Sequence, residues 1–155
     1  MSKRWLVGAA LVFVVACSSW GIAASIPKGL VDSKPDQAML ISPQEWYKAH
    51  PVLDKKGLIA ETVYSSPRTM VSVRTGVKGW AAGSHFHATT DEIVVVLGGS
   101  GEILVNGTWV AAKAGDIHVC PRGVVHDTRA LTENFQFISI YSPQLPPGGD
   151  ANMIK

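Results

Sequence analysis

Short apolar runs separated by turn residues dominate the chain from Gly57 onward. Asn106-Gly107 is the strongest turn signal, because a two-residue type I′ hairpin turn needs positive φ at both positions. Many short strands at close spacing, with no helical pattern after residue 51, predict an all-β sandwich or closed barrel over residues 57–142. Segments rich in Val, Ile, Phe and Thr predict its strands at Leu58–Tyr64, Met70–Val77, Glu92–Leu97, Glu102–Val105, Thr108–Ala111, Ile117–Cys120 and Phe135–Tyr141.

The segments on either side of the predicted barrel have different patterns. Residues 25–56 form a lead-in segment in which Ser42-Pro43-Gln44-Glu45 is a capping box with proline at the first helical position. This box predicts a short helix that runs to about His50, where Trp46 and His50 pack or lie at the surface without a catalytic role. Residues 143–155 form a C-terminal tail, whose prolines and glycines exclude it from a central strand.

The first residues have the order of an export signal rather than of a fold. Lys3 and Arg4 precede an uncharged apolar run, and small residues follow at 23–25. Cleavage would remove residues 1–24. The segment ending in Cys17 also resembles a bacterial lipobox, in which that cysteine carries a lipid anchor, and an uncleaved membrane anchor is a third interpretation. The first two predict a periplasmic or otherwise extracytoplasmic protein.

Composition and charge narrow the classes of partner. Apolar residues make up 46% of the 155 residues and charged residues 17%, which is typical of one globular domain. The formal charge of +2 falls to zero once Lys3 and Arg4 are removed, so nucleic acid is not an expected partner. Once Cys17 is removed or lipidated, Cys120 is the one remaining cysteine, and it is interpreted as a small buried residue. A homodimer is compatible with this composition.

Three histidines and one glutamate have spacings that suit a metal site. Residues i and i+2 of a strand point to the same face, so His85 and His87 would enter one side of a sheet. Glu92 follows at an odd spacing, and a bend at residues 88–91 would restore the shared face. His126 follows the turn Pro121-Arg122-Gly123, which could return the chain to the same point. Three imidazoles and one carboxylate suit a divalent transition metal such as Mn, Fe, Zn or Ni.

Two motifs in this region resemble those of the cupin superfamily. Gly83-x-His85-x-His87-x4-Glu92-x6-Gly99 is similar to the first cupin motif, apart from the short spacing after its leading glycine. Gly115-x5-Pro121-x-Gly123-x2-His126 is similar to the second. The resemblance implies a cupin-type jelly-roll β-barrel with one metal in its mouth. The second motif usually has an asparagine four residues after its histidine, and this chain has Ala130 there.

A fold shared by many chemistries does not by itself define a reaction. One hypothesis is a metal-dependent enzyme of the oxygenase, decarboxylase or isomerase type, acting on a small oxygen-rich molecule. The alternative is a non-catalytic module that binds a small ligand or the metal itself, and a metal-free structural domain is the third interpretation. Candidate acid–base residues are Arg74, Gln136 and Tyr141, whereas Asp91 is better interpreted as a turn residue and His118 as a packing or rim residue.

Overall fold

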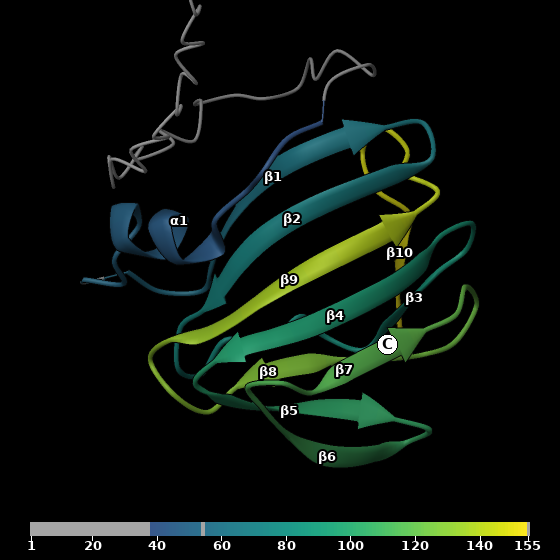
Figure 1. Cartoon of the computed structure of the whole chain (residues 1–155). Coiled ribbons are helices and arrows are strands. Elements are labelled where there is room, and N and C mark those ends of the chain that lie inside the picture. The colour runs from purple at the N-terminus through teal and green to yellow at the C-terminus, as the bar shows by residue number, and fades with distance from the viewer. Residues whose placement is uncertain (1–37, 54, 155) are drawn as a thin grey trace, which may run out of the picture.

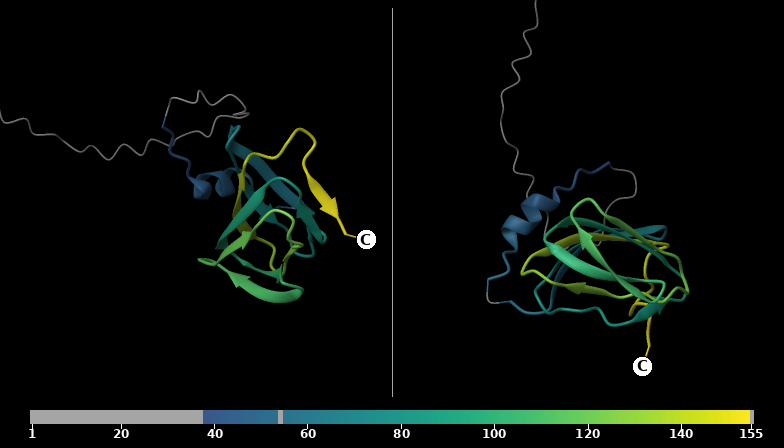
Figure 2. Two further views of the ribbon diagram at one scale, coloured as in Figure 1. Left: turned by 90° about the vertical axis from the view of Figure 1, so that its right-hand side faces the viewer. Right: turned by 90° about the horizontal axis from the view of Figure 1, so that it is seen from below.

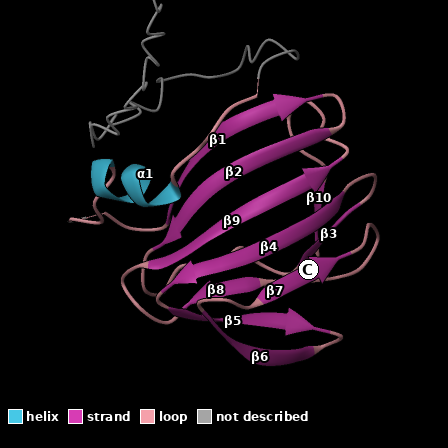
Figure 3. Cartoon of the chain, in the orientation of Figure 1, coloured by secondary structure: helices cyan, strands magenta, loops and turns pink. Residues whose placement is uncertain are grey.

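The computed structural model describes residues 38–53 and 55–154. Within those residues it contains one helix and ten strands (Figures 1 and 3). In chain order they are α1 (Pro43–Ala49), β1 (Leu58–Ser66), β2 (Thr69–Gly76), β3 (His85–His87), β4 (Asp91–Gly98), β5 (Ser100–Val105), β6 (Thr108–Lys113), β7 (Ile117–Cys120), β8 (Thr128–Ala130), β9 (Phe135–Ser142) and β10 (Ala151–Met153).

The strands form two facing layers, and every pair of neighbouring strands is antiparallel (Figures 1 and 2). The first layer is a five-stranded sheet in the order β1-β2-β9-β4-β7. The second combines the sheet β6-β5-β8 with the pair β10-β3, and the isolated bridges Ala81–Arg129 and His85–His126 join them. The fold is the predicted cupin-type jelly roll, although no ladder among the described strands closes the two layers into a continuous barrel.

The interior between the layers is apolar at one end and polar at the other. Side chains alternate along β9, so Phe135, Phe137 and Tyr141 all point inward and are buried. Phe135 and Phe137 pack into the main core with residues of β4, β5, β6 and β8. Tyr141 lies at the other end, where its cross-strand partner on β4 is Glu92. The register of β4 and β9 therefore divides the interior into a core and a polar cavity.

The helix α1 packs on the five-stranded sheet through Trp46, which is 1% exposed. Trp46 contacts Val63 of β1 and Val73 of β2, and its indole Nε1 donates to Glu61 at 2.7 Å. His50 stacks on the same indole with ring centroids 4.4 Å apart. The predicted helix and the packing interpretation of Trp46 and His50 are confirmed, and Ser42 caps the helix through the Glu45 N–H.

All seven predicted strands are present, and their ends agree with the prediction to within two residues. The predicted Asn106-Gly107 turn has φ of 49° and 80°, as its type requires. Residues 143–150 are loop, as expected, but β10 then pairs with β3, a pairing that was not predicted. The proposed signal, residues 1–24 with Cys17, lies outside the described residues. Within the part of the chain that is described, no helix is long and apolar enough to cross a membrane.

Phe135 tests whether the main core holds the two layers together. Its side chain is fully buried, and it packs against Phe137 with ring centroids 5.3 Å apart. Phe135→Ala should lower the free energy of unfolding by about 3–5 kcal/mol, because it leaves a cavity in a close-packed interior. Urea denaturation measures this loss. Val119→Ala, at a side chain that is 59% exposed, is the control and should change stability by less than about 0.5 kcal/mol. Equal losses in the two variants would contradict the assigned core.

Candidate metal centre

His85 and His87 enter the cavity from β3, the short strand whose pairing places them both on the inner face. His85 N donates to His126 O at 2.9 Å, and His126 N donates to His85 O at 2.8 Å. These two backbone bonds hold His126 directly beside His85, although 41 positions separate them in the sequence. The turn at Pro121-Arg122-Gly123 makes this return possible, because Gly123 adopts a φ of 78°.

Glu92 reaches the same point from the opposite layer. β3 ends at His87 and β4 begins at Asp91, so residues 88–90 carry the chain from the second layer to the five-stranded sheet. At the predicted bend the chain therefore passes from one layer to the other. The alternation of side chains along a single strand does not apply across this change, so the odd spacing does not prevent His87 and Glu92 from pointing into the same cavity. On β4, Glu92 has Tyr141 and Cys120 as its cross-strand neighbours.

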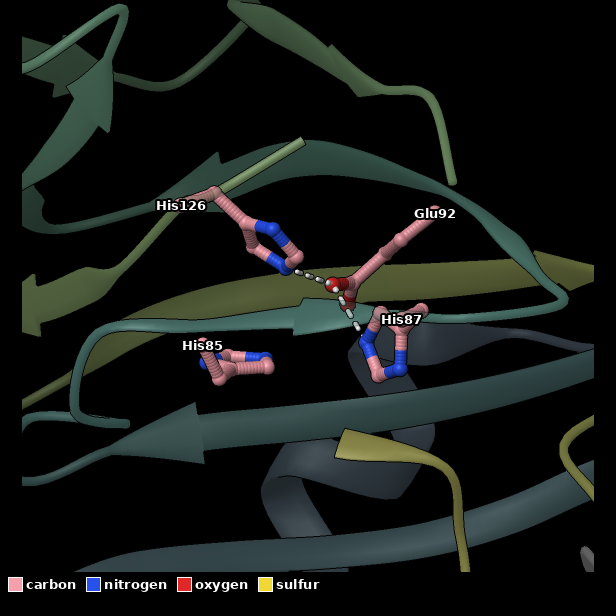
Figure 4. A group of neighbouring side chains, drawn as sticks. All are labelled: His85, His87, Glu92 and His126. Carbon is pink, nitrogen blue, oxygen red and sulfur yellow. Dashed lines mark hydrogen bonds and ion pairs between the residues drawn. The ribbon is translucent and has the colours of Figure 1, made fainter. Parts of the chain in front are cut away.

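The four predicted ligand side chains form one buried cluster. His85, His87, Glu92 and His126 each offer a ligand atom, and these atoms all lie within 4.8 Å of one another. His126 Nε2 lies 3.1 Å from Glu92 Oε2, and His87 Nε2 lies 3.5 Å from the same oxygen (Figure 4). None of the four is more than 9% exposed. The structure thus brings together the whole predicted set.

The other nitrogen of each imidazole has a fixed acceptor. His85 Nδ1 lies 2.6 Å from Gly83 O, and His87 Nδ1 lies 2.6 Å from a carboxylate oxygen of Asp150. His126 Nδ1 lies 3.0 Å from Val124 O and 2.8 Å from Cys120 Sγ. Because carbonyl and carboxylate oxygens only accept, each Nδ1 must carry a proton and donate it. A neutral ring then leaves the lone pair on Nε2, the nitrogen available to a metal.

The donor set fits a divalent transition metal. His87 Nε2 is buried and makes no hydrogen bond, since 3.5 Å to Glu92 is beyond hydrogen-bond range. A buried polar atom without a partner costs free energy, and a metal ion would provide that partner. Three imidazole nitrogens and one carboxylate are ligands that first-row transition metals accept. The four residues could therefore hold one ion, in the manner of cupins.

Without a metal, the cluster takes up protons. Burial lowers the pKa of His126, but hydrogen bonds to Cys120, Glu92 and the Val124 carbonyl outweigh it and raise this pKa to about 10. Burial also opposes the charge on His87, yet Glu92 and Asp150 raise its pKa above the ordinary value. Burial would raise the pKa of Glu92, but its hydrogen bond to His126 and the nearby imidazole of His87 hold it well below the usual range. A metal must therefore displace protons from these imidazoles.

Asp150 is a site residue that sequence reasoning missed. It follows the Gly148-Gly149 pair in the predicted tail, and its second carboxylate oxygen accepts from Thr89 N at 3.1 Å and Thr89 Oγ1 at 2.9 Å. These bonds orient the carboxylate toward His87. A carboxylate behind a ligating histidine is a common supporting arrangement in metal sites. The sequence carries little signal for it, because 63 positions separate Asp150 from His87.

Cys120 is not only a small buried residue, as interpreted from the sequence, but also contacts one of the four clustered side chains. It is 2% exposed, as expected, but its thiol contacts the Nδ1 of His126. The alternation of β7 could have indicated this, because Cys120 faces inward with His118 while Ile117 and Val119 are exposed. His118 lies beside the cluster, with its ring 6.2 Å from that of His126, and is not one of the four clustered side chains.

The other candidate residues divide into two groups. Arg74 and Tyr141 line a cavity of about 310 Å³ together with the four clustered residues. Tyr141 is 2% exposed and burial raises its pKa, so it stays protonated at neutral pH. Gln136 does not line this cavity. Asp91 is exposed and accepts the Arg122 N–H at 2.8 Å, in agreement with its interpretation as a turn residue.

Comparison with known proteins agrees with this fold and site. The family model described as "Cupin domain" matches residues 73–141, which include all four clustered residues. Residues 73–141 therefore form a cupin domain. A curated relative, an uncharacterized protein of Aquifex aeolicus (strain VF5), is 37% identical over 59 residues. That match covers 38% of this chain and spans about half the length of the relative, 49%.

Solved structures of similar fold come from several bacteria. KdgF from Halomonas sp. has a TM-score of 0.56 at 25% identity, covering 59% of this chain and 84% of that one. An uncharacterized conserved protein with a double-stranded β-helix domain from Klebsiella pneumoniae has a TM-score of 0.58 at 25% identity, covering 75% and 95%. A predicted oxalate decarboxylase from Thermotoga maritima has a TM-score of 0.53 at 22% identity, covering 56% and 81%, and shares the fold.

The raised pKa of His126 can be tested on metal-free protein. We expect His126 to remain protonated at pH 8, whereas His85, whose pKa burial lowers, is neutral there. Cys120→Ala should lower the pKa of His126, because it removes an acceptor from the imidazolium. Nitrogen chemical shifts of the imidazoles, followed by NMR against pH, report both. Ile117→Ala, on the exposed face of β7, is the control.

The same shift has a defined effect on stability. The folded-state pKa of His126 lies above the ordinary value of 6.5. Its protonation therefore stabilises the metal-free fold fully below about pH 6.5, and this contribution is lost as the pH rises through about 10. A His126 that titrates near 6.5 in wild type, or an unchanged pKa in Cys120→Ala, would contradict the assigned hydrogen bonds.

Proposed function

We propose that this protein is an exported single-domain cupin that binds one divalent metal through His85, His87, Glu92 and His126. It would act as a metal-dependent enzyme on a small oxygen-rich molecule. The observation that carries the proposal is the arrangement of the three imidazoles. Each Nδ1 has its own acceptor, so each Nε2 is available beside the single carboxylate of Glu92. Burying four polar side chains together costs free energy, and a metal ion bound to all four would offset this cost.

The protein's own residues would bind and orient the substrate. A bound Mn, Fe, Zn or Ni ion would supply Lewis-acid polarisation of a substrate oxygen or, for Mn or Fe, dioxygen chemistry. Tyr141 keeps its proton and can donate a hydrogen bond into the cavity beside Glu92. Apolar side chains, among them Trp80, Phe137 and Leu145, form the rest of the wall and limit access of water.

One observation favours the alternative of a non-catalytic binding module. Among the described residues, the side chains that line the cavity include no carboxylate and no imidazole besides those of the four clustered residues. Tyr141 keeps its proton at neutral pH, and an arginine side chain has no acceptor atom, so neither Tyr141 nor Arg74 is a general base there. Catalysis would then depend on the metal and on Tyr141 as a hydrogen-bond donor. A module that captures a ligand outside the cytoplasm needs no such groups.

Metal content tests the site. His87→Ala and His126→Ala should each lose most of the bound metal, whereas Glu92→Gln keeps its shape and one oxygen donor and should lose less. Asp150→Asn should weaken metal affinity by about 10- to 100-fold, because His87 loses its charged partner. Metal affinity should also fall as the pH is lowered, because the raised pKa values of His87 and His126 favour their protonated forms.

Elemental analysis of the purified protein and competition with a chelator measure these changes. His118→Ala is the matched control, because this histidine lies beside the cluster without belonging to it. It should keep the metal content of wild type. Equal metal content in wild type and His87→Ala would refute the proposed site.

Turnover with different metals separates the enzyme from the binding module. Extracytoplasmic Zn and Cu compete for imidazole sites, so we expect protein as isolated to contain zinc or copper. For an oxygenase or decarboxylase, the zinc form should be folded and inactive, and Mn or Fe(II) should restore turnover of a carboxylate, enol or sugar substrate. Highest activity with zinc would count against this type of enzyme. No turnover with any of these metals would favour the binding module.

Export is proposed from residues 1–24 and is tested by the intact mass of the native protein. Plain cleavage predicts a mass without those residues, and a lipobox predicts a chain that begins with lipidated Cys17. Cys17→Ser should abolish only the second product. Full-length protein recovered in the cytoplasm would refute both routes and with them the extracytoplasmic location.

A further inference from the structure

Arg74 places a positive charge on the wall of the metal cavity. It lies on β2, and its cross-strand partner on β9 is Phe137, whose side chain also lines the cavity. The Arg74 guanidinium carbon is 5.4 Å from the centroid of the Tyr141 ring. Arg74 lines the same cavity as Glu92 and Tyr141, so its charge acts on the same space.

This charge has no acidic partner of its own among residues 38–53 and 55–154. Arg74 forms no ion pair there, and its Nε is buried without a hydrogen-bond partner. By contrast, Arg129 donates to the carboxylate of Glu102 and stacks on Trp109. Glu92 is the acid that Arg74 influences, but its carboxylate is bound to the histidine cluster. A buried guanidinium N–H without an acceptor is costly, and a ligand oxygen would satisfy it.

The charge balance of the cavity favours an anion. Glu92 and Asp150 supply two negative charges, whereas Arg74 and a divalent ion would together supply three positive ones. A cavity with an excess of one sign attracts ligands of the other sign, most strongly where its walls are apolar. A guanidinium binds a carboxylate through two parallel hydrogen bonds, which also fixes the orientation of the ligand.

The remainder of the cavity suits an uncharged carbon body. Its apolar lining residues are Leu58, Trp80, Val94, Phe137, Leu145 and Met153. Trp80 and Phe137 stack with centroids 5.9 Å apart and an angle of 24° between their planes. The volume of about 310 Å³ is at the small end of the range for ligand pockets, about 300–1,000 Å³. A second ionised group on the ligand would have no partner on this wall.

We propose that the cavity binds a small monocarboxylate that has a hydroxyl or carbonyl oxygen on the adjacent carbon and an uncharged, largely apolar body. The carboxylate pairs with Arg74, the second oxygen faces the histidine cluster, and the carbon body packs against Trp80 and Phe137. This assignment rests on the proposed metal site and narrows its substrates to the 2-hydroxy and 2-oxo acids.

Calorimetric titration of zinc-loaded protein with 3-phenyllactate and with its methyl ester tests the assignment. The two probes share the hydroxyl and the ring, and only the acid carries a charge. Wild type should bind the acid about ten- to a hundredfold more tightly than the ester, the range expected for hydrogen bonds to a charged group. Arg74→Met should lose this preference. Arg74→Lys should keep part of it, because lysine keeps the charge and loses the planar fork.

The controls separate this proposal from that of the metal site. Zinc content should be equal in wild type and both Arg74 variants, because Arg74 is not one of the clustered ligands. Arg68→Met, at an exposed arginine in the β1–β2 turn, should keep the full preference. Zinc-loaded wild type that binds both probes alike or neither, or Arg74→Met that keeps the preference, would overturn the carboxylate assignment alone. Wild type that holds no zinc would refute the metal site, and the assignment with it.

Discussion

The three imidazoles of the cavity can act together only because each Nδ1 is tied to an acceptor. The acceptors come from separate segments: the Gly83 carbonyl before β3, the Val124 carbonyl after β7, the Cys120 thiol on β7 and the Asp150 carboxylate before β10. An imidazole free to rotate could offer either nitrogen or a proton. The jelly roll matters for function because its two layers deliver these acceptors to one place.

This constraint has a cost that the rest of the site offsets. Four polar groups are buried at one end of the interior, where unpaired charges would destabilise the fold. In the metal-free protein Glu92 and the protonated His126 compensate one another, and His87 adds a second positive neighbour. A metal ion would replace those protons and take over the same role. The charges of the cluster therefore compensate one another without the ion, and no other described residues form such a set.

Sequence predicted the parts of this arrangement that depend on short spacing. The strands follow from apolar runs between turns, the helix from its capping box, and the clustered side chains from the two glycine- and histidine-containing motifs. It did not predict the three-residue strands β8 (Thr128–Ala130) and β10 (Ala151–Met153). Neither has a strand pattern of its own, and β10 pairs only along the edge of β3. Asp150 was missed for the same reason, because it lies 63 positions from His87 and has no local signature. The contact of Cys120 with His126 is local, and the alternation of β7, which turns Cys120 inward, was the available signal for it.

The site and the free charge of Arg74 would together make the cavity a receptor for an anion that also offers oxygen to a metal. That account depends on the metal occupying the Nε2 side of the rings. Anomalous diffraction from crystals of the protein soaked in Mn(II) or Zn(II) is the most direct test of it. We predict one strong peak that contacts Nε2 of His85, His87 and His126 and a carboxylate oxygen of Glu92. A soaked crystal with no peak in this cavity, or with the ion bound elsewhere through an Nδ1 or the Cys120 thiol, would contradict it.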